Sequence, residues 1–86
     1  MKGNHTQRLL RTFGATIKQR REELGISQEE LADRAGLHRT YVSDIERGAR
    51  NVALANIVSL AAALDLKPST LLKSLDSVSG VPEQDP

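Results

Sequence analysis

The sequence predicts a small all-α domain built from five helices. Apolar residues recur at helical spacing along most of the chain, and glycines follow several of these patterns where helices commonly end. The aromatic residues are only Phe13 and Tyr41, so the core must be aliphatic, which favours packed helices over a β-sandwich. With 86 residues, the chain has room for one modest core and little else.

The first helix is predicted over residues 7–24, and residues 1–6 are expected to be a flexible N-terminus. Its apolar positions recur at helical spacing: Leu10, Phe13, Ile17 and Leu24. Gly25 follows as a natural C-cap. Gly14, inside the helix, costs about 1 kcal/mol relative to alanine, so we expect another element to pack closely against it.

The second helix is predicted to begin after Ser27 and to end at Gly36 after about two turns. Ser27 can accept a hydrogen bond from the backbone N–H of Glu30, and the Glu30 side chain can reach back, which makes a capping box. The apolar stripe of this helix consists of Leu31, Ala32 and Ala35.

The third helix is predicted from Arg39 to Arg47 and is closed by Gly48. His38 lies at its N-cap position and is a candidate for a cap or for a phosphate contact. Val42 and Ile45 are expected to face the core. The outer side of the helix is then polar and consists of Arg39, Thr40, Ser43 and Asp44.

A fourth helix is predicted from Leu54 to Leu64, and it is apolar nearly all round, which suggests burial on more than one side. Pro68 suits the first turn of a fifth helix, whose apolar side consists of Leu71, Leu72 and Leu75. The folded domain is therefore predicted over residues 7–75. Residues 76–86 are acidic and rich in Gly, Pro and Ser, and we expect them to be a disordered tail.

Composition excludes several classes of protein. No cysteine is present, which excludes disulfide frameworks, thiolate zinc sites and cysteine nucleophiles. The N-terminus lacks the apolar core of a signal peptide, and no apolar run approaches the ~18 residues of a membrane helix, so we expect a soluble, cytoplasmic protein. Residues 1–50 carry ten Lys or Arg and seven Asp or Glu, whereas residues 51–86 carry two and four. A basic front half suits a protein that presents one face to phosphates.

The sequence supports no catalytic or metal site. His5 and His38 are isolated from any carboxylate pair, the serines lack a plausible general base, and no glycine loop could cradle a phosphate. We therefore expect no enzyme activity, no metal, no cofactor and no small-molecule ligand.

Two short helices joined by a tight turn are typical of a helix-turn-helix, in which the second helix enters the major groove of DNA. Arg39 is the strongest candidate for base contacts because its guanidinium can bind guanine O6 and N7 together. Thr40 suits a thymine methyl group or a phosphate, and the small Ser43 allows close approach. Asp44 either accepts a hydrogen bond from a cytosine amino group or orients Arg39 or Arg47.

Phosphate contacts are expected around the same helix. Gln28, at the start of the second helix, offers its amide and nearby backbone N–H groups. Arg47, Arg50 and Asn51 supply further donors just beyond the third helix. These neighbours favour a DNA-binding face over an ordinary solvated surface.

Arg21 and Glu46 lie at the edges of the apolar stripes of the first and third helices, and we predict an ion pair between them. The alternative is two independent surface charges. Such a partly buried pair orients helices more than it stabilises them, because breaking one partner costs more than the pair contributes.

The segment GISQEELADRAGLHRTYVSDIERGARNVALANIVSLAAAL resembles the Cro/repressor, or xenobiotic-response-element type, helix-turn-helix family. Within that family, RTYVSDIERGARNV is most similar to the controller proteins of restriction-modification systems. The resemblance runs from about Phe13 to Leu75 and implies a dimeric, lambda-repressor-like domain, with Tyr41 as a further contact to the DNA backbone. His38, Asp44 and Ala53 depart from the family pattern. The first two leave the base preference open, and Ala53 weakens the start of the fourth helix.

The leucines of the last two helices exceed what one small core can cover, which predicts a dimer. We expect five residues to supply part of a two-fold interface: Val58, Leu66, Leu71, Leu72 and Leu75. A dimer would hold two recognition helices about 34 Å apart and read a pseudo-palindrome.

The predicted function is a sequence-specific, DNA-binding transcriptional regulator that acts as a homodimer, with restriction-modification controller as the candidate role. The alternative keeps the fold but uses the last helix and the acidic tail to bind a protein, as an antitoxin or adaptor would. The two functions differ in salt dependence, because phosphate contacts predict an affinity that falls steeply with salt.

Overall fold

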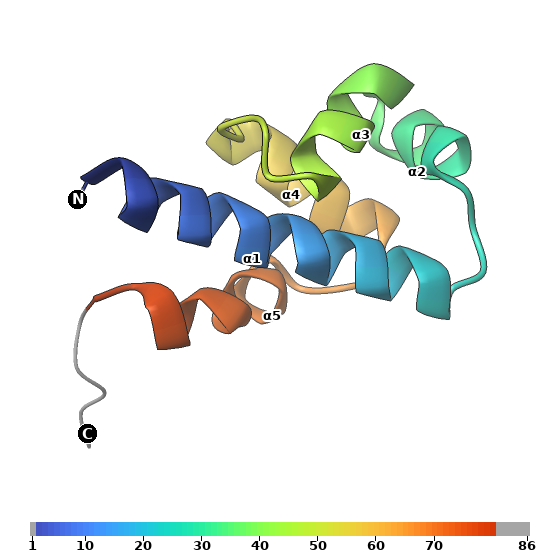
Figure 1. Ribbon diagram of the computed structural model, residues 1–86. Coiled ribbons are helices and arrows are strands. Elements are labelled where there is room, and N and C mark those ends of the chain that lie inside the picture. Colours follow the sequence, from blue (N-terminus) through green and yellow to red (C-terminus); the bar gives the residue numbers. More distant parts are fainter. Residues whose placement is uncertain (1, 81–86) are drawn as a thin grey trace.

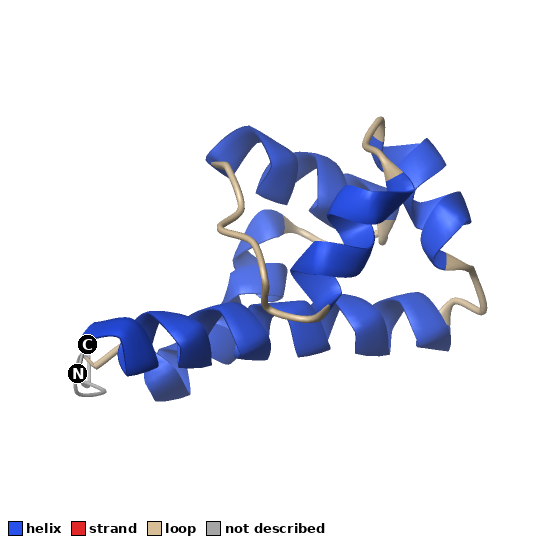
Figure 2. Ribbon diagram, turned by 45° about the horizontal axis from the view of Figure 1, so that its top comes forward, coloured by secondary structure: helices blue, strands red, loops and turns tan. Residues whose placement is uncertain are grey.

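The computed structural model describes residues 2–80, with side chains from His5 onward. The helices are α1 (Lys2–Glu23), α2 (Gln28–Ala35), α3 (Arg39–Glu46), α4 (Leu54–Ala63), α5 (Pro68–Leu72) and the 3-10 helix η1 (Lys73–Val78). Figure 2 shows these helices joined by loops, with no strand in the described part of the chain. The predicted all-α fold with five α-helices is confirmed.

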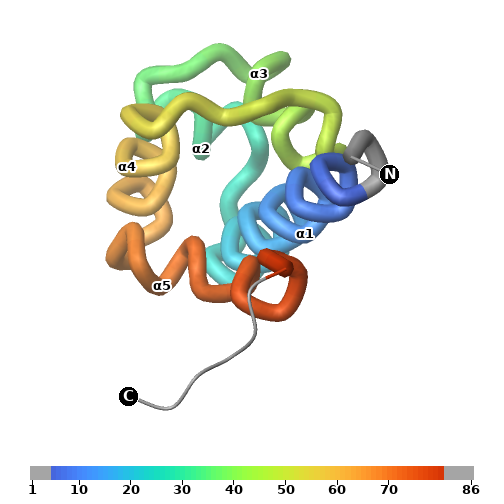
Figure 3. Tube along the Cα trace, turned by 90° about the vertical axis from the view of Figure 1, so that its left-hand side faces the viewer, coloured from blue at the N-terminus to red at the C-terminus, as the bar shows by residue number. Residues whose placement is uncertain are grey.

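The long helix α1 runs across the molecule between two groups of helices (Figure 1). Helices α2 and α3 lie on one side of it and η1 on the other, while α4 packs against α2 and α5 across the bundle from α1 (Figure 3). The large buried side chains between them come from all five α-helices: Phe13, Ile17, Leu31, Val42, Ile45, Leu60, Leu64 and Leu71. Phe13 is the one aromatic residue among them, so the core is almost entirely aliphatic, as predicted.

The first helix is longer than predicted. It begins at Lys2 rather than at Gln7, so the predicted boundary after residue 6 falls inside α1. Extending an existing helix adds one hydrogen bond for each residue that is fixed, and polar residues without proline can therefore continue it cheaply. The prediction placed the start at the first apolar residues, which mark where packing begins and not where the helix begins.

The other end of the domain also extends further than predicted. Residues 76–78 belong to η1, which packs against α1, whereas the sequence assigned them to the tail. Thr16 Oγ1 on α1 donates a hydrogen bond to Ser74 Oγ on η1 at 2.8 Å and helps to hold this segment. Residues 81–86 of the predicted disordered tail lie outside the described residues.

Ser27 and Gly36 bound α2 as predicted. Ser27 Oγ accepts a hydrogen bond from the backbone N–H of Glu30 at 3.0 Å, and Gly36 has a φ of 71°, the left-handed conformation that suits glycine. The second half of the predicted capping box is wrong. Glu30 does not reach back, because its carboxylate accepts a hydrogen bond from Arg34 Nε, one helical turn further on, at 3.1 Å.

Helices α1 and α3 approach so closely that Gly14 has no room for a side chain. A Cβ built at Gly14 would lie 2.2 Å from the carbonyl oxygen of Ile45 and 2.7 Å from that of Glu46. The close packing predicted at this glycine is confirmed, and it explains why the helix carries a residue of low helix propensity there. The contact fixes the C-terminal end of α3 against α1.

Candidate nucleic-acid interface

Helix α3 presents a polar outer face at the surface of the domain. Its buried residues are Val42 and Ile45, as predicted. On the opposite side Arg39 and Thr40 are exposed and Ser43 is half-buried. Figure 1 shows α3 on the far side of α1 from α5, and the exposure of Arg39 and Thr40 leaves its outer face in contact with solvent.

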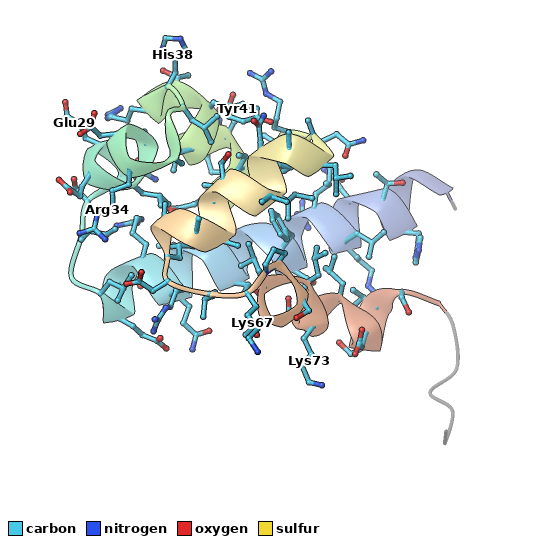
Figure 4. All side chains as sticks on the ribbon, turned by 180° about the vertical axis from the view of Figure 1, so that it is seen from behind. Glu29, Arg34, His38, Tyr41, Lys67 and Lys73 are labelled. Carbon is cyan, nitrogen blue, oxygen red and sulfur yellow. The ribbon has the colours of Figure 1, made fainter. Side chains whose placement is uncertain are left out.

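His38 lies at the N-cap position of α3, but its side chain makes no capping hydrogen bond. It is exposed and points away from the domain at the outer end of the helix pair (Figure 4). The capping role, one of its two predicted roles, is therefore wrong, because the imidazole extends into solvent instead of folding back over the helix. The phosphate contact stays a prediction.

Gln28 is the first residue of α2, and its side-chain amide forms a hydrogen bond to another residue of the protein. Its Nε2 donates a hydrogen bond to Glu46 Oε1 at 2.9 Å. An amide nitrogen carries two hydrogens, so the second N–H can still serve a phosphate. Sequence reasoning missed this contact, since the spacing of residues 28 and 46 gives no sign that they meet.

Arg21 and Glu46, which were predicted to pair, form a two-pronged contact between α1 and α3. Arg21 Nε donates to Glu46 Oε2 at 2.7 Å, and Arg21 Nη2 donates to Glu46 Oε1 at 3.1 Å. The Arg21 side chain is 12% exposed and the Glu46 side chain only 2%. Arg21 Nη1 also donates to the carbonyl oxygen of Ile26 at 2.9 Å, so the pair holds the loop before α2 as well. The hydrogen bond to Glu46 raises the pKa of Arg21 above its ordinary value, and the pair stays charged on the arginine side at neutral pH.

Asp44 lies between two arginines at the end of α3. Arg47 Nη2 donates a hydrogen bond to Asp44 Oδ1, and Arg50 Nη2 donates one to Asp44 Oδ2 at 3.3 Å. Of the two arginines that Asp44 was predicted to orient, Arg47 is bound and Arg39 is not. Positions three or four apart share a helix face, whereas Arg39 is five positions away. Arg50 is an additional partner that the loop after α3 brings back to the helix.

Tyr41 connects this loop to α4. The guanidinium carbon of Arg50 lies 5.1 Å from the centroid of the Tyr41 ring, which is a cation–π distance. Tyr41 Oη accepts a hydrogen bond from Asn56 Nδ2 at 3.0 Å. These three side chains line a shallow groove of about 570 Å³ beside the start of α3. Asn51, also predicted to contact DNA, is exposed in the same loop.

A second distinctive surface is the outer side of α4, which is apolar. Leu54 is 74% exposed and Val58 is 48% exposed, so within one chain one apolar side of this helix, which was predicted to be buried on more than one side, is open to solvent. Three of the predicted interface residues are half-buried against the core: Leu66, Leu72 and Leu75. Leu71 is fully buried, and its predicted place in an interface is wrong because α5 turns it inward against α4 and α1.

Other kinds of site find no basis in the described residues. Between residues 2 and 80, no three His, Cys, Asp or Glu side chains gather as a metal site requires. None of the helices in that range is both long and apolar enough to cross a bilayer. The candidate functional site is therefore the polar outer face of α3 together with the arginines beside it.

A helix-turn-helix family model matches residues 17–71, which include all of α2 and α3. The chain belongs to the helix-turn-helix family. The resemblance noted from the segment of residues 25–64 is thereby confirmed. The relatives are control proteins and transcriptional regulators rather than enzymes.

Three relatives of this helix-turn-helix protein show the closeness of the match. Control protein C.BamHI of Bacillus amyloliquefaciens is 51% identical over 61 residues, which cover 70% of this chain and 75% of that protein. The restriction-modification controller protein C.AhdI from Aeromonas hydrophila has a crystal structure that matches with a TM-score of 0.71 at 50% identity, over 72% of this chain and 94% of that one. The restriction-modification controller protein C.Esp1396I, solved as a tetramer in complex with its natural 35 base-pair operator, matches with a TM-score of 0.72 at 33% identity, over 81% and 92%. The predicted similarity to controller proteins is confirmed.

For two residues of this helix-turn-helix protein, the sequence analysis did not predict the contact or the exposure that the structure shows. Asn56 holds Tyr41, and Leu54 is the most exposed large apolar side chain of the described residues. A signal for Asn56 was present, because a single amide within an otherwise apolar run needs a hydrogen-bonding partner. For Leu54 there was no such signal, since its helix was expected to be covered on several sides.

Proposed function

We propose that the protein is a sequence-specific, DNA-binding transcriptional regulator that acts as a homodimer on a pseudo-palindromic operator and serves as a restriction-modification controller. The observation that carries this proposal is the open polar face of α3, flanked by the exposed arginines at positions 47 and 50. Relatives named as controller proteins, one of them solved on its operator, support it. The proposed location is the cytoplasm, and double-stranded DNA is the proposed ligand, without a cofactor.

In this proposal α3 lies in the major groove with Arg39 and Thr40 toward the base edges. The Arg39 guanidinium binds guanine O6 and N7 together, a contact that discriminates against other bases by about 1–3 kcal/mol. Ser43 is small and half-buried, so the helix axis can approach the bases closely. Thr40 offers a methyl group to thymine or a hydroxyl to a phosphate.

Phosphate contacts on either side of α3 fix its register in the groove. The proposed set is Gln28, His38, Tyr41, Arg47, Arg50 and Asn51. Gln28 contributes at the start of α2, where unpaired backbone N–H groups also favour an anion. Arg50 rests on the Tyr41 ring in the free protein, so less side-chain entropy is lost when it binds a phosphate.

Replacing Arg39 with alanine is expected to weaken binding to a specific duplex by roughly 5- to 150-fold, the equivalent of 1–3 kcal/mol. Binding to a scrambled duplex should change far less, because the contact that is lost reads a base. Fluorescence anisotropy measures both affinities, using a duplex that the wild-type protein selects from a randomised pool and a scrambled duplex of equal length.

Arg34→Ala is the matched control for Arg39→Ala. Arg34 lies on α2, is exposed, and pairs with Glu30, so its replacement removes the same charge from the neighbouring helix. Equal losses of specific binding in the two variants would show that Arg39 acts through charge alone and would reject its role as a base reader.

The apolar outer side of α4 supports the proposed homodimer. Exposed leucine and valine on one helix face are more costly in water than in an interface, where each buried side chain contributes about 1.5–3 kcal/mol. We propose an interface centred on Leu54 and Val58, which the half-buried residues Leu66, Leu72 and Leu75 extend.

Val58→Glu is expected to convert the dimer into a monomer at tens of micromolar protein, because an unpaired carboxylate would have to enter the apolar contact. Ala15→Glu adds the same charge at an exposed position of α1 and should leave the dimer intact. Sedimentation velocity separates the two outcomes. A wild-type protein that sediments only as a monomer at this concentration would refute the dimer.

A further inference from the structure

A carboxylate stands among the arginines of the proposed DNA-binding surface. Both oxygens of Asp44 accept hydrogen bonds, one from Arg47 and one from Arg50. The Asp44 side chain is 20% exposed, compared with 65% for Arg47 and 50% for Arg50. The two guanidinium groups therefore reach solvent around an acid that is largely covered.

The fold does not require these contacts. The packing of α3 depends on Val42 and Ile45, which are buried, and on the pair between Arg21 and Glu46. Ion pairs with exposed arginines contribute little to stability. What Asp44 changes is the charge that an approaching phosphate meets, since the three side chains together carry one positive charge where the two arginines alone would carry two.

The lower positive charge affects non-specific DNA binding more than specific DNA binding. Non-specific binding rests almost entirely on phosphate contacts, so a carboxylate that occupies two arginines weakens it directly. Specific binding also gains from base contacts, which can offset the cost of separating the arginines from the acid.

We propose that Asp44 is a specificity-determining residue, which withholds Arg47 and Arg50 from phosphates until α3 is seated on its operator. Asp44 then acts through the two arginines and not by contacting a base. Arg50 is held from a second side by the Tyr41 ring, whereas among the described residues the Arg47 side chain pairs with Asp44 alone. Arg47 is therefore the arginine that Asp44 controls most directly. The inference rests on the proposed function as a DNA-binding regulator.

The test compares Asp44→Asn with Asp76→Asn. Asp76 is exposed on η1, on the opposite side of α1 from α3, so its replacement makes the same change in net charge away from the proposed surface (Figure 1). Affinities are measured by fluorescence anisotropy over a salt series, with the selected duplex and the scrambled duplex described above. Circular dichroism checks that each variant is folded.

Asp44→Asn is expected to raise affinity for the scrambled duplex by roughly three- to tenfold and to lower the ratio of specific to non-specific binding. The slope of log affinity against log salt for the scrambled duplex should steepen by about 0.9 for each arginine released. Asp76→Asn should change the scrambled affinity by less than about twofold. Asp44→Glu, which keeps the charge, should retain most of the discrimination.

A second comparison isolates the arginines. In a protein that already carries Arg47→Gln and Arg50→Gln, Asp44→Asn should affect the scrambled duplex no more than Asp76→Asn does. The inference is overturned if Asp44→Asn leaves non-specific binding unchanged and weakens only the selected duplex, which is the result expected of a base reader. A wild-type protein that cannot distinguish the two duplexes would instead overturn the proposed function itself.

Discussion

Glu46→Ala is expected to destabilise the domain by about 3–5 kcal/mol, because it leaves the guanidinium of Arg21 without its partner in a largely covered position. Gln28 loses the acceptor of its amide at the same time. A loss of this size in so small a domain lowers the melting temperature by more than about 10 °C. Urea denaturation followed by circular dichroism, at one fixed protein concentration, measures the change.

Two controls identify the source of that loss. Glu30→Ala removes an equally charged but exposed partner, that of Arg34, and should cost less than about 1 kcal/mol. Replacing both members of the buried pair, with Arg21→Met and Glu46→Leu together, should restore most of the stability because no buried charge is then left unpaired. A double variant as unstable as Glu46→Ala would contradict this explanation.

Gly14→Ala is expected to destabilise the domain by about 3 kcal/mol, although alanine has the higher helix propensity. The added methyl group would lie 2.2 Å from the carbonyl oxygen of Ile45, and a backbone atom cannot move aside as a flexible side chain can. The helices would have to separate. The same denaturation experiment measures the effect.

Ala15→Gly is the matched control, since it exchanges the same two residues in reverse at the next, exposed position. It should cost about 1 kcal/mol, the ordinary propensity difference. If Gly14→Ala proved stabilising by a similar amount, the close contact between α1 and α3 would be refuted.

The parts of the fold that follow from local rules were predictable from the sequence. Val42 and Ile45 were assigned to the core from helical periodicity, and Gly36 was assigned to a helix end from its freedom to adopt positive φ. The pairing of Arg21 with Glu46 could be anticipated because both charges border stripes on helices that must pack together. The open polar side of α3 follows from the same periodicity.

Other features depend on the tertiary path of the chain, and local sequence rules do not predict them. The contact between Asp44 and Arg50 requires the particular path of the loop after α3. Leu71 was assigned to an interface although it is fully buried, and the exposure of Leu54 was not anticipated, because the sequence pattern of an apolar residue is the same whether it faces the core or the surface. The failure of the Glu30 capping role is different, because Arg34 lies four positions further on, and a local (i, i+4) ion pair competes with the capping box.

The contact at Gly14 has a consequence for how such a regulator can change during evolution. The spacing between α1 and α3 is set there by backbone atoms, which no substitution on the outer face of α3 alters. Arg39 and Thr40 are exposed and support none of the core. Substitutions at these two positions can therefore accumulate without shifting the helix, and if the two residues contact bases as proposed, related proteins can acquire new operators while they keep one shared fold.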